Sequence, residues 1–182
     1  MRTDFLPEGM LYAKQKAIDI NTLIEAYESK TILEGIVSSC SPEHNLTVRL
    51  GDLECIVERC DAAIGIREGI TRDIALISKV GKPICFTVKS IERNIYGQYE
   101  IYLSRREAQE MALNYLLRTL APCDIIPAII THLEPFGAFC DIGCGIVSFI
   151  GIENISISRI SHPSDRFVVG QRIYALVTQI EP

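Results

Sequence analysis

An internal repeat of 14 residues, with its two copies 89 positions apart, constrains the fold of this chain more than any other feature. KVGKPICFTVKSIE (Lys79–Glu92) and VVGQRIYALVTQIE (Val168–Glu181) align without a gap, and a glycine occupies the third position of both. After that glycine, β-branched and aromatic residues alternate with polar ones, which is typical of a strand. A repeat at a fixed offset indicates a duplicated module. The chain is therefore predicted to contain two copies of one β-rich unit.

Each repeat is preceded by three further segments that are typical of strands. These are residues 31–40, 46–52 and 54–59 in the first copy, and 124–133, 138–143 and 146–152 in the second. The first copy also has a fifth strand at 99–104, after a turn around Gly97. Five short strands with one long connection from the third to the fourth favour a small OB-type barrel over a sandwich.

The second copy leaves no residues for a fifth strand, because its fourth strand runs to the end of the sequence at Pro182. A barrel without one strand exposes a sheet edge and part of its core. Three explanations stay open: the natural protein continues beyond Pro182, which we favour, another chain fills the gap, or the second copy is incomplete. The open edge also makes a strand-exchanged or edge-paired oligomer an alternative.

Two helices are expected from capping-box patterns, in which Ser or Thr is followed three residues later by Glu. Thr22 with Glu25 marks the first helix, and Ser104 with Glu107 marks the second. The second helix should pack, because apolar residues line one of its faces. These residues are Ala108, Met111, Ala112, Tyr115 and Leu116.

The predicted fold class is mainly β with helices, namely two tandem OB-fold five-stranded barrels joined by an α-helix, the second barrel lacking its last strand. The domains expected are a helical extension (1–30, with a separate short helix over 7–18), a divergent first barrel (31–104), a connecting helix (105–121) and a second barrel (122–182).

The composition excludes several classes of protein. No segment has the apolar length of a signal peptide or a membrane span, so we expect a soluble, cytoplasmic protein without membrane contact. Seven cysteines favour free thiols. Cys140 and Cys144 lack a second pair at zinc-site spacing, and no nucleotide-binding or catalytic motif is present, so we expect no metal, no cofactor and no enzymatic activity.

The charge is unevenly distributed between the two copies. The chain carries a net −5, which is unusual for a protein that binds phosphates. Residues 79–106 nevertheless have an excess of four positive charges, whereas residues 121–182 have a deficit of three. Lys89 and Arg93 are four residues apart on a predicted strand and should share a face. Arg105 and Arg106 fall in a first helical turn, where positive charge is unfavourable, which suggests a partner for them. The alternative is that the basic residues of this run are ordinary solvated charges.

The segment LEPFGAFCDIG places Phe136 and Phe139 around Gly137 in the acidic second copy. Two exposed rings form a platform on which bases of a single strand stack without sequence readout. The structural alternative is that one ring caps the barrel and that Gly137 only permits a turn.

The second copy resembles the S-one type RNA-binding domain, the OB-fold repeat of the largest ribosomal small-subunit protein and of several RNases. The resemblance is carried by Asp124–Ile126, Phe136–Phe139, Asp141–Gly143, Gly145 and Val169–Gly170. The first copy resembles the family more weakly, through ILEGIVSS, its fourth strand and IYLSRREA. A helix, a divergent repeat and a second repeat are together similar to the N-terminal part of bacterial ribosomal proteins of this type.

The resemblance implies base stacking on Phe136 and Phe139, and on a third-strand histidine whose position is held here by Gly151. The basic positions on the family's first strand are held here by Ile129 and His132, so only the weak, mostly neutral donor His132 remains. In the first copy PEHN (Pro42–Asn45) replaces the aromatic tetrad and Glu58 the histidine. The predicted RNA-binding residues are Phe136, Phe139, His132, Arg172, Lys89 and Arg93.

Two functions follow as hypotheses. The first is non-catalytic binding of single-stranded RNA or mRNA in translation, at the small ribosomal subunit. The alternative is a protein-docking module that anchors a longer RNA-binding protein to the ribosome. The acidic balance and the missing histidine favour the docking module, and the aromatic tetrad favours RNA binding.

Overall fold

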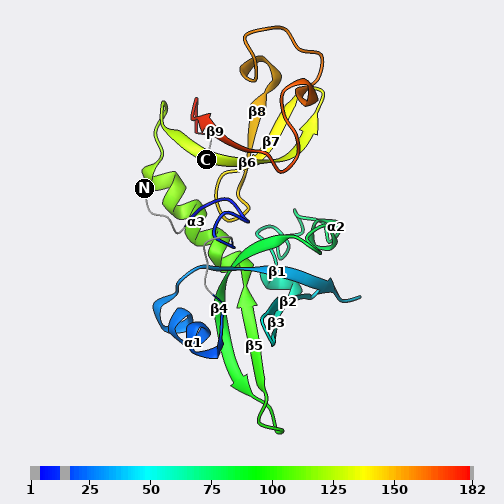
Figure 1. The fold of residues 1–182 in the computed structure, drawn as a ribbon, viewed down its shortest axis with the longest axis vertical. Coiled ribbons are helices and arrows are strands. Elements are labelled where there is room, and N and C mark those ends of the chain that lie inside the picture. Colours follow the sequence, from blue (N-terminus) through cyan, green and yellow to red (C-terminus); the bar gives the residue numbers. More distant parts are fainter. Residues whose placement is uncertain (1–4, 13–16, 181–182) are drawn as a thin grey trace. The chain divides into compact units, whose positions relative to one another are not determined.

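The chain forms two compact units in the computed structural model, which describes residues 5–12 and 17–180. Unit 1 contains Glu8–Met111, and unit 2 contains Phe5–Pro7 with Ala112–Pro182 (Figure 1). The division falls inside the long helix α3 (Arg105–Thr119), the helix predicted to connect the two barrels. Among the described residues, no helix has the length and apolarity needed to cross a bilayer.

Unit 1 is a closed five-stranded barrel. Its strands are β1 (Leu33–Cys40), β2 (Leu46–Leu50), β3 (Leu53–Val57), β4 (Pro83–Arg93) and β5 (Tyr99–Ser104). They follow each other around the barrel in the order β1-β2-β3-β5-β4, and β4 pairs back onto β1. Only β3 and β5 are parallel. This arrangement fits the predicted OB fold.

The core of unit 1 follows from the alternation of its strands, since every second side chain points inward. Val48, Ile84 and Leu103 are fully buried in this way. Helix α1 (Ile20–Ser29) contacts β4 and adds Leu23 and Ala26 to the same core.

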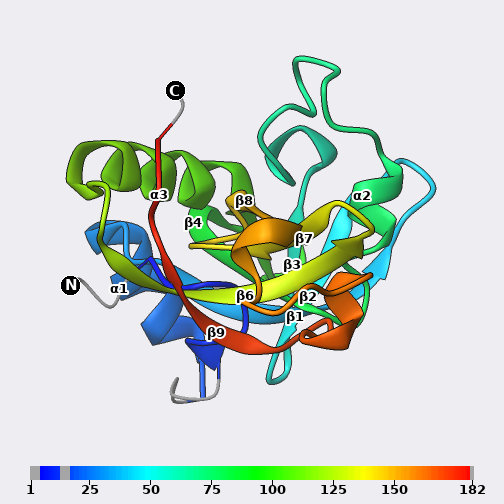
Figure 2. The same ribbon diagram turned by 90° about the horizontal axis from the view of Figure 1, so that it is seen from above.

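Unit 2 is an open four-stranded sheet with the same strand order. It consists of β6 (Ile125–Glu134), β7 (Gly137–Asp141), β8 (Val147–Gly151) and β9 (Arg172–Leu176), arranged as β8-β7-β6-β9. In Figure 2, β6 lies between β9 and β7. This is the order of unit 1 with β5 left out, and no described residue of unit 2 forms a fifth strand.

The long connection from the third to the fourth strand also repeats. In unit 1 it contains the 3₁₀ turn η2 (Arg59–Asp61) and the short helix α2 (Ile74–Ile77), and in unit 2 the 3₁₀ turns η3 (Ile152–Asn154) and η4 (Pro163–Asp165). Glu58 precedes η2 with φ −61° and ψ 148°, and Gly151 precedes η3 with φ −62° and ψ 147°. Glu58 and Gly151 therefore occupy equivalent places in the two units.

Of the two predicted helix starts, that of α3 is correct and that of α1 is not. α1 begins at Ile20, and its cap is Asp19, whose carboxylate accepts from the Thr22 backbone N–H at 2.8 Å and the Thr22 hydroxyl at 2.6 Å. The prediction of Thr22 as the cap is wrong, because Thr22 lies inside the helix and donates to the capping carboxylate of Asp19. At the start of α3, the Ser104 hydroxyl accepts from the Glu107 N–H at 3.0 Å, as expected.

The predicted packing face of α3 is confirmed by Ala108, Ala112 and Leu116, all buried. A helix over 7–18 is not confirmed, because residues 8–11 form turns and residues 13–16 of that prediction lie outside the described residues. All seven cysteines are free thiols.

Candidate nucleic-acid interface

A row of aromatic side chains crosses the outer face of the unit 2 sheet. His132 on β6 pairs with Phe139 on β7, and Phe139 pairs with Phe149 on β8. Ala138 and Cys140 are buried on the inner side, so the side chain between them points outward. The ring centroids of Phe139 and Phe149 are 5.2 Å apart, and those of His132 and Phe139 are 6.2 Å apart.

Phe136 joins this row from the turn between β6 and β7. Its ring lies 5.8 Å from the Phe149 ring and stands edge-on to Phe139 at 6.3 Å, distances typical of aromatic pairs. Phe136 is 57% exposed and Phe149 47% exposed. We call Phe136, Phe139, Phe149 and His132 the aromatic face.

A β-bulge places His132 on this face. The pairing of β6 with β7 shifts between Ile130 and His132. Without the extra residue, His132 would point inward with Ile130, because side chains two residues apart share a face. The bulge reverses the alternation, so Ile130 is buried while His132 stands outside beside Phe139. The His132 Nε2 lies 2.7 Å from the Glu134 carboxylate, which orients the ring.

Gly137 is needed for close approach and not for the turn. A Cβ atom on Gly137 would lie 2.4 Å from the Ile150 carbonyl oxygen and 2.4 Å from the Phe149 ring. Gly137 is not among the glycines with positive φ. The interpretation that it only permits a turn is therefore wrong, because the Phe149 ring packs directly over it.

Phe149 is the member of the face that the sequence did not single out. The resemblance pointed to position 151, where the family has a histidine and this chain has a glycine, which has no side chain. Phe149 lies two residues earlier on the same side of β8 and supplies a ring to the face. The alternation of VSFIG, with Phe149 as an outward position, was the available signal.

Arg172 lies on the same sheet face but nearer the opposite edge. It is exposed on β9 and pairs with Ile129 of β6. Ile173 and Ala175, its neighbours in the alternation, pack on the inner core. The structure thus places Phe136, Phe139, His132 and Arg172 on one side of unit 2.

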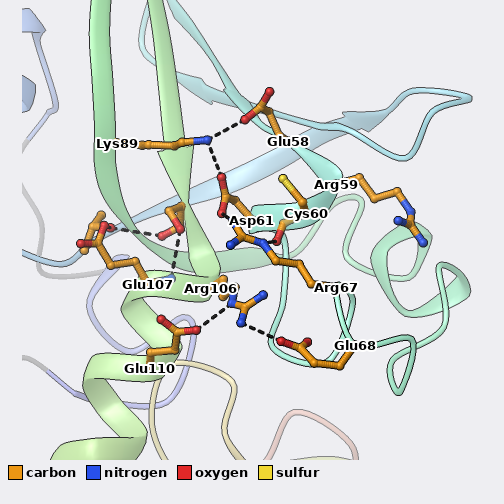
Figure 3. A network of polar contacts seen from close by, with 12 residues as sticks. Glu58, Arg59, Cys60, Asp61, Arg67, Glu68, Lys89, Arg106, Glu107 and Glu110 are labelled. Carbon is orange, nitrogen blue, oxygen red and sulfur yellow. Dashed lines mark hydrogen bonds and ion pairs between the residues drawn. The ribbon is translucent and has the colours of Figure 1, made fainter.

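Lys89 and Arg93 lie in unit 1, where the structure gives each an internal partner. The Lys89 ammonium lies 2.7 Å from both the Glu58 and the Asp61 carboxylates (Figure 3). Hydrogen bonds to Asp61 and then to Glu58 raise the pKa of Lys89 above its ordinary value. Arg93 donates to the Tyr99 hydroxyl at 2.7 Å and lies over that ring.

The shared face expected for Lys89 and Arg93 depends on unbroken alternation. The pairing of β4 with β5 shifts between Val88 and Ser90, which makes Lys89 the extra residue of a bulge. Strand alternation does not continue across such a residue, so the spacing of four residues does not place Lys89 and Arg93 on one face.

The first-turn arginines of α3 also have carboxylate partners. The Arg105 Nε donates to Glu8 at 2.6 Å. Arg106 donates to Glu68 and Glu110 at 2.7 Å each (Figure 3). The partner that their unfavourable position suggested is internal to the protein. The local excess of positive charge over 79–106 is thus largely paired with carboxylates of unit 1.

One cluster in unit 1 has the composition of a metal site. Ligand atoms of Glu58, Cys60 and Asp61 lie within 4.8 Å of one another. The Lys89 ammonium already holds the position between the two carboxylates, and Arg67 contacts Asp61 at 2.5 Å. The positive charge that balances these carboxylates is therefore supplied by the Lys89 and Arg67 side chains.

The matching face of unit 1 carries no aromatic ring at the paired positions. The registers of the two sheets match His132 with Ser39, Phe139 with Thr47 and Phe149 with Ile56. Counting back from β2, the tetrad Phe136–Phe139 falls on His44–Thr47. The predicted match with Pro42–Asn45 is therefore wrong by two residues.

Comparison with known proteins agrees with this architecture of OB-type units. Residues 121–182 match the S1 RNA binding domain family. The small ribosomal subunit protein bS1 of Neisseria meningitidis serogroup B is 28% identical over 171 residues, covering 92% of this chain and 28% of that protein. The bS1 protein of Helicobacter pylori strain J99 is 36% identical over 64 residues, covering 35% of this chain and 12% of that protein.

A solved structure from Streptococcus pneumoniae, described as a multidomain protein with nucleic acid binding domains, covers 84% of this chain and 47% of that one. Its identity is 19% and its TM-score 0.31, too low to support a conclusion. The sequence relatives are more informative: residues 121–182 match the S1 RNA binding domain family, and most of the chain is similar in sequence to a bS1 protein. It spans less than a third of the length of either bS1 relative.

Proposed function

We propose that unit 2 binds single-stranded RNA in translation, with the aromatic face as the stacking surface. The observation that supports the proposal is the grouping of Phe136, Phe139 and Phe149 with His132 on one exposed face of an S1-type sheet. Planar rings that are held in place by a sheet offer base stacking at little entropic cost. The function needs no covalent chemistry and no cofactor.

Stacking supplies most of the affinity in this proposal. Each stacked base contributes roughly 1–3 kcal/mol, independently of its identity. His132 lies beside Phe139, and Arg172 lies on the same sheet face nearer the opposite edge, where a phosphate would add a salt-dependent contribution. Lys89 and Arg93 stay predictions as RNA contacts, since Lys89 would have to exchange two carboxylates for a phosphate.

The test is fluorescence anisotropy of a labelled single-stranded RNA of about 12 nucleotides, titrated with the intact chain at several salt concentrations. Phe136→Ala combined with Phe139→Ala should weaken binding about tenfold or more, the equivalent of one lost stacking contact. Phe149→Ala should weaken it by a smaller factor. The matched control is Tyr96→Ala, a ring 81% exposed on the β4–β5 hairpin of unit 1, which should leave affinity unchanged.

Affinity that is indifferent to the double substitution would contradict the proposal, as would undetectable binding at low salt. The electrostatic and stacking contributions can be separated by salt dependence. Arg172→Ala should change the slope of log affinity against log salt concentration, whereas the affinity lost on phenylalanine substitution should be the same at every salt concentration.

A protein-docking role is the second candidate, and one observation in unit 1 favours it. Helix α2 exposes Ile74 (66%) and Ile77 (45%), and Ile70 (81%) precedes it. Residues three apart on a helix share a face, so Ile74 and Ile77 present adjoining apolar surface. Exposed apolar surface of this kind marks protein contacts. Ile74→Asp with Ile77→Asp should abolish co-sedimentation with small ribosomal subunits and spare RNA affinity, if unit 1 anchors the chain to the ribosome.

A further inference from the structure

The connection between β8 and β9, residues 152–171, carries two arginines without a carboxylate partner. Arg159 and Arg166 are both exposed, and among the described residues neither forms an ion pair. The equivalent connection of unit 1 differs, because its Arg59 and Arg67 both contact carboxylates. The two arginines of unit 2 are therefore available to an anion from outside the chain.

The acidic residues of unit 2 do not neutralise these arginines, because they bind the backbone. Asp165 lies in the same connection, and its carboxylate accepts from the Ser161 N–H at 3.1 Å and from the His162 N–H at 3.3 Å. The Asp141 carboxylate accepts from two backbone N–H groups of the turn that follows it. Carboxylates that bind turns in this way stabilise local structure. The acidic balance of unit 2 thus leaves Arg159 and Arg166 unpaired.

Both ends of the connection lie beside the aromatic face. Directly after β8, the Ile152 N–H donates to the Phe136 carbonyl at 3.0 Å. Before β9, the Gly170 N–H donates to the Ile130 carbonyl at 2.7 Å, at the bulge that turns His132 outward. Between these points η4 packs against β6, and Figures 1 and 2 show the orange connection beside the yellow end of β6. The connection therefore borders the end of the sheet from which Phe136 and His132 project.

The connection is held in place by its own side chains. Ile155 and Phe167 pack against the inner core of unit 2, and Pro163 is buried. The Phe167 N–H donates to the Pro163 carbonyl at 2.8 Å. The Arg166 Nε donates to the Ser156 hydroxyl at 3.4 Å, which links the two halves of the connection. An ordered loop loses little conformational entropy when its side chains bind a ligand.

We propose that Arg159 and Arg166 bind phosphates of the same strand whose bases stack on the aromatic face. The inference rests on the proposed function of unit 2 and adds its phosphate contacts. Rings that stack on bases leave the sugars and phosphates of the strand at the border of the stacking surface, and this connection forms one border. A guanidinium group presents planar donors that match phosphate oxygens. Stacking and phosphate attraction are thus supplied by different elements, the sheet and the connection.

Salt dependence tests the proposal in the RNA titration described above. Each phosphate contact to a single strand contributes about 0.7 to the slope of log affinity against log salt concentration. Arg159→Gln combined with Arg166→Gln should therefore reduce the magnitude of the slope by about 1.4. Arg159→Lys combined with Arg166→Lys should preserve the slope, because the charge is kept.

The matched control for the loss of charge is Arg118→Gln. Arg118 is an exposed arginine of the same unit and lies on α3. Leu116 of α3 lines a cavity together with the inward side chains Cys140 and Ala175, so this helix covers the inner side of the sheet. The slope should be unchanged by Arg118→Gln. An equal change of slope in the control and in the double glutamine variant would overturn the proposal, as would a glutamine variant with the wild-type slope.

A second probe separates the phosphate contacts from stacking. An abasic phosphodiester oligomer of the same length carries phosphates without bases, and it should shift the NMR resonances of the Arg159 and Arg166 Nε–H groups. Phe136→Ala with Phe139→Ala should leave these shifts intact. Shifts of this kind, together with RNA affinity that is indifferent to the phenylalanines, would support the phosphate contacts and contradict stacking. Unshifted arginine resonances, with RNA affinity that still depends on the phenylalanines, would overturn the phosphate contacts alone.

Discussion

Units 1 and 2 share one strand order but present different outer faces. The inward residues of both follow the same alternation, and four strands have the same order in the closed barrel of unit 1 and the open sheet of unit 2. At the three matched outward positions, unit 1 has Ser39, Thr47 and Ile56, and unit 2 has His132, Phe139 and Phe149. Outward positions do not fill the core, so they vary without loss of the fold. The comparison shows that the fold and the chemistry of its outer face are specified by different residues.

The charged groups sharpen this contrast. At the position before the first 3₁₀ turn, unit 1 has Glu58, which binds Lys89, and unit 2 has Gly151. Lys89 of unit 1 forms ion pairs with Glu58 and Asp61 (Figure 3). In unit 2, Phe136 and Phe149 are exposed. Each prediction below alters one unit and leaves the other as the internal reference.

The largest effect is expected from Glu8→Gln in unit 1. The Glu8 side chain is buried and bonded to Arg105 at 2.6 Å and Lys79 at 2.8 Å. Removal of its charge breaks the buried ion pair with the Arg105 guanidinium, which should cost roughly 3–5 kcal/mol in the free energy of unfolding. Hydrogen exchange should report faster opening of β4 and β5, with β6 and β7 unchanged. Equal loss of protection in both units would contradict the assignment of this ion pair to unit 1.

The same carboxylate makes unit 1 sensitive to acid. Burial opposes the charge of Glu8, but Arg105 and Lys79 outweigh it and lower the pKa from 4.5 to about 2. A lowered pKa stabilises the folded state fully above pH 4.5, and this stabilisation is lost as the pH falls toward about 2. The stability difference between wild type and Glu8→Gln should therefore shrink over that range, measured by denaturant unfolding at each pH. A constant difference down to pH 2 would exclude this cause.

A smaller effect is expected from Gly137→Ala in unit 2. The added methyl group would meet the Ile150 carbonyl and the Phe149 ring at 2.4 Å, which forces β8 outward. Overpacking of this kind costs roughly 1–3 kcal/mol and should also reduce RNA affinity by moving Phe149. The control is Gly151→Ala, the ladder partner of Gly137, where the new atom meets only the flexible Glu153 carboxylate. Thermal unfolding that ranks the two variants equally would contradict the argument.

The smallest effect is expected from Lys89→Met. The loss of hydrogen bonds to Glu58 and Asp61 should destabilise unit 1 by about 1–2 kcal/mol, because Arg67 still neutralises Asp61. RNA affinity should change less than twofold, since the proposed stacking face is in unit 2. An exposed lysine before β4, Lys82, provides the control Lys82→Met. A clear loss of RNA affinity with Lys89→Met alone would make Lys89 an RNA contact and extend the interface to unit 1.

Most of the fold was predictable because it rests on local patterns. Alternation located every strand of both sheets to within a few residues, and Ser104 marked the start of α3. The cap of α1 was misplaced because Asp19 and Thr22 both have capping side chains, and the carboxylate is the one that accepts the hydrogen bonds. A short-range motif cannot decide between two such candidates.

The candidate site was predictable in part. Phe136 and Phe139 are three residues apart in sequence, and the structure brings them together as a turn predicts. Phe149 and His132 join them only through cross-strand pairing, and His132 does so only because of the bulge after Ile130. Lys89 and Arg93 were expected to be available for phosphates, but their neighbours in space are Glu58, Asp61 and Tyr99.

The sequence by itself determined the duplicated unit and the approximate limits of its strands, because these depend on periodicity and on glycines within single segments. Only the tertiary structure decided which outward side chains form a common face and which charges neutralise one another. These features depend on pairing register, and register is a relation between segments far apart in the chain. A bulge of one residue changes that relation without leaving a mark in either segment alone.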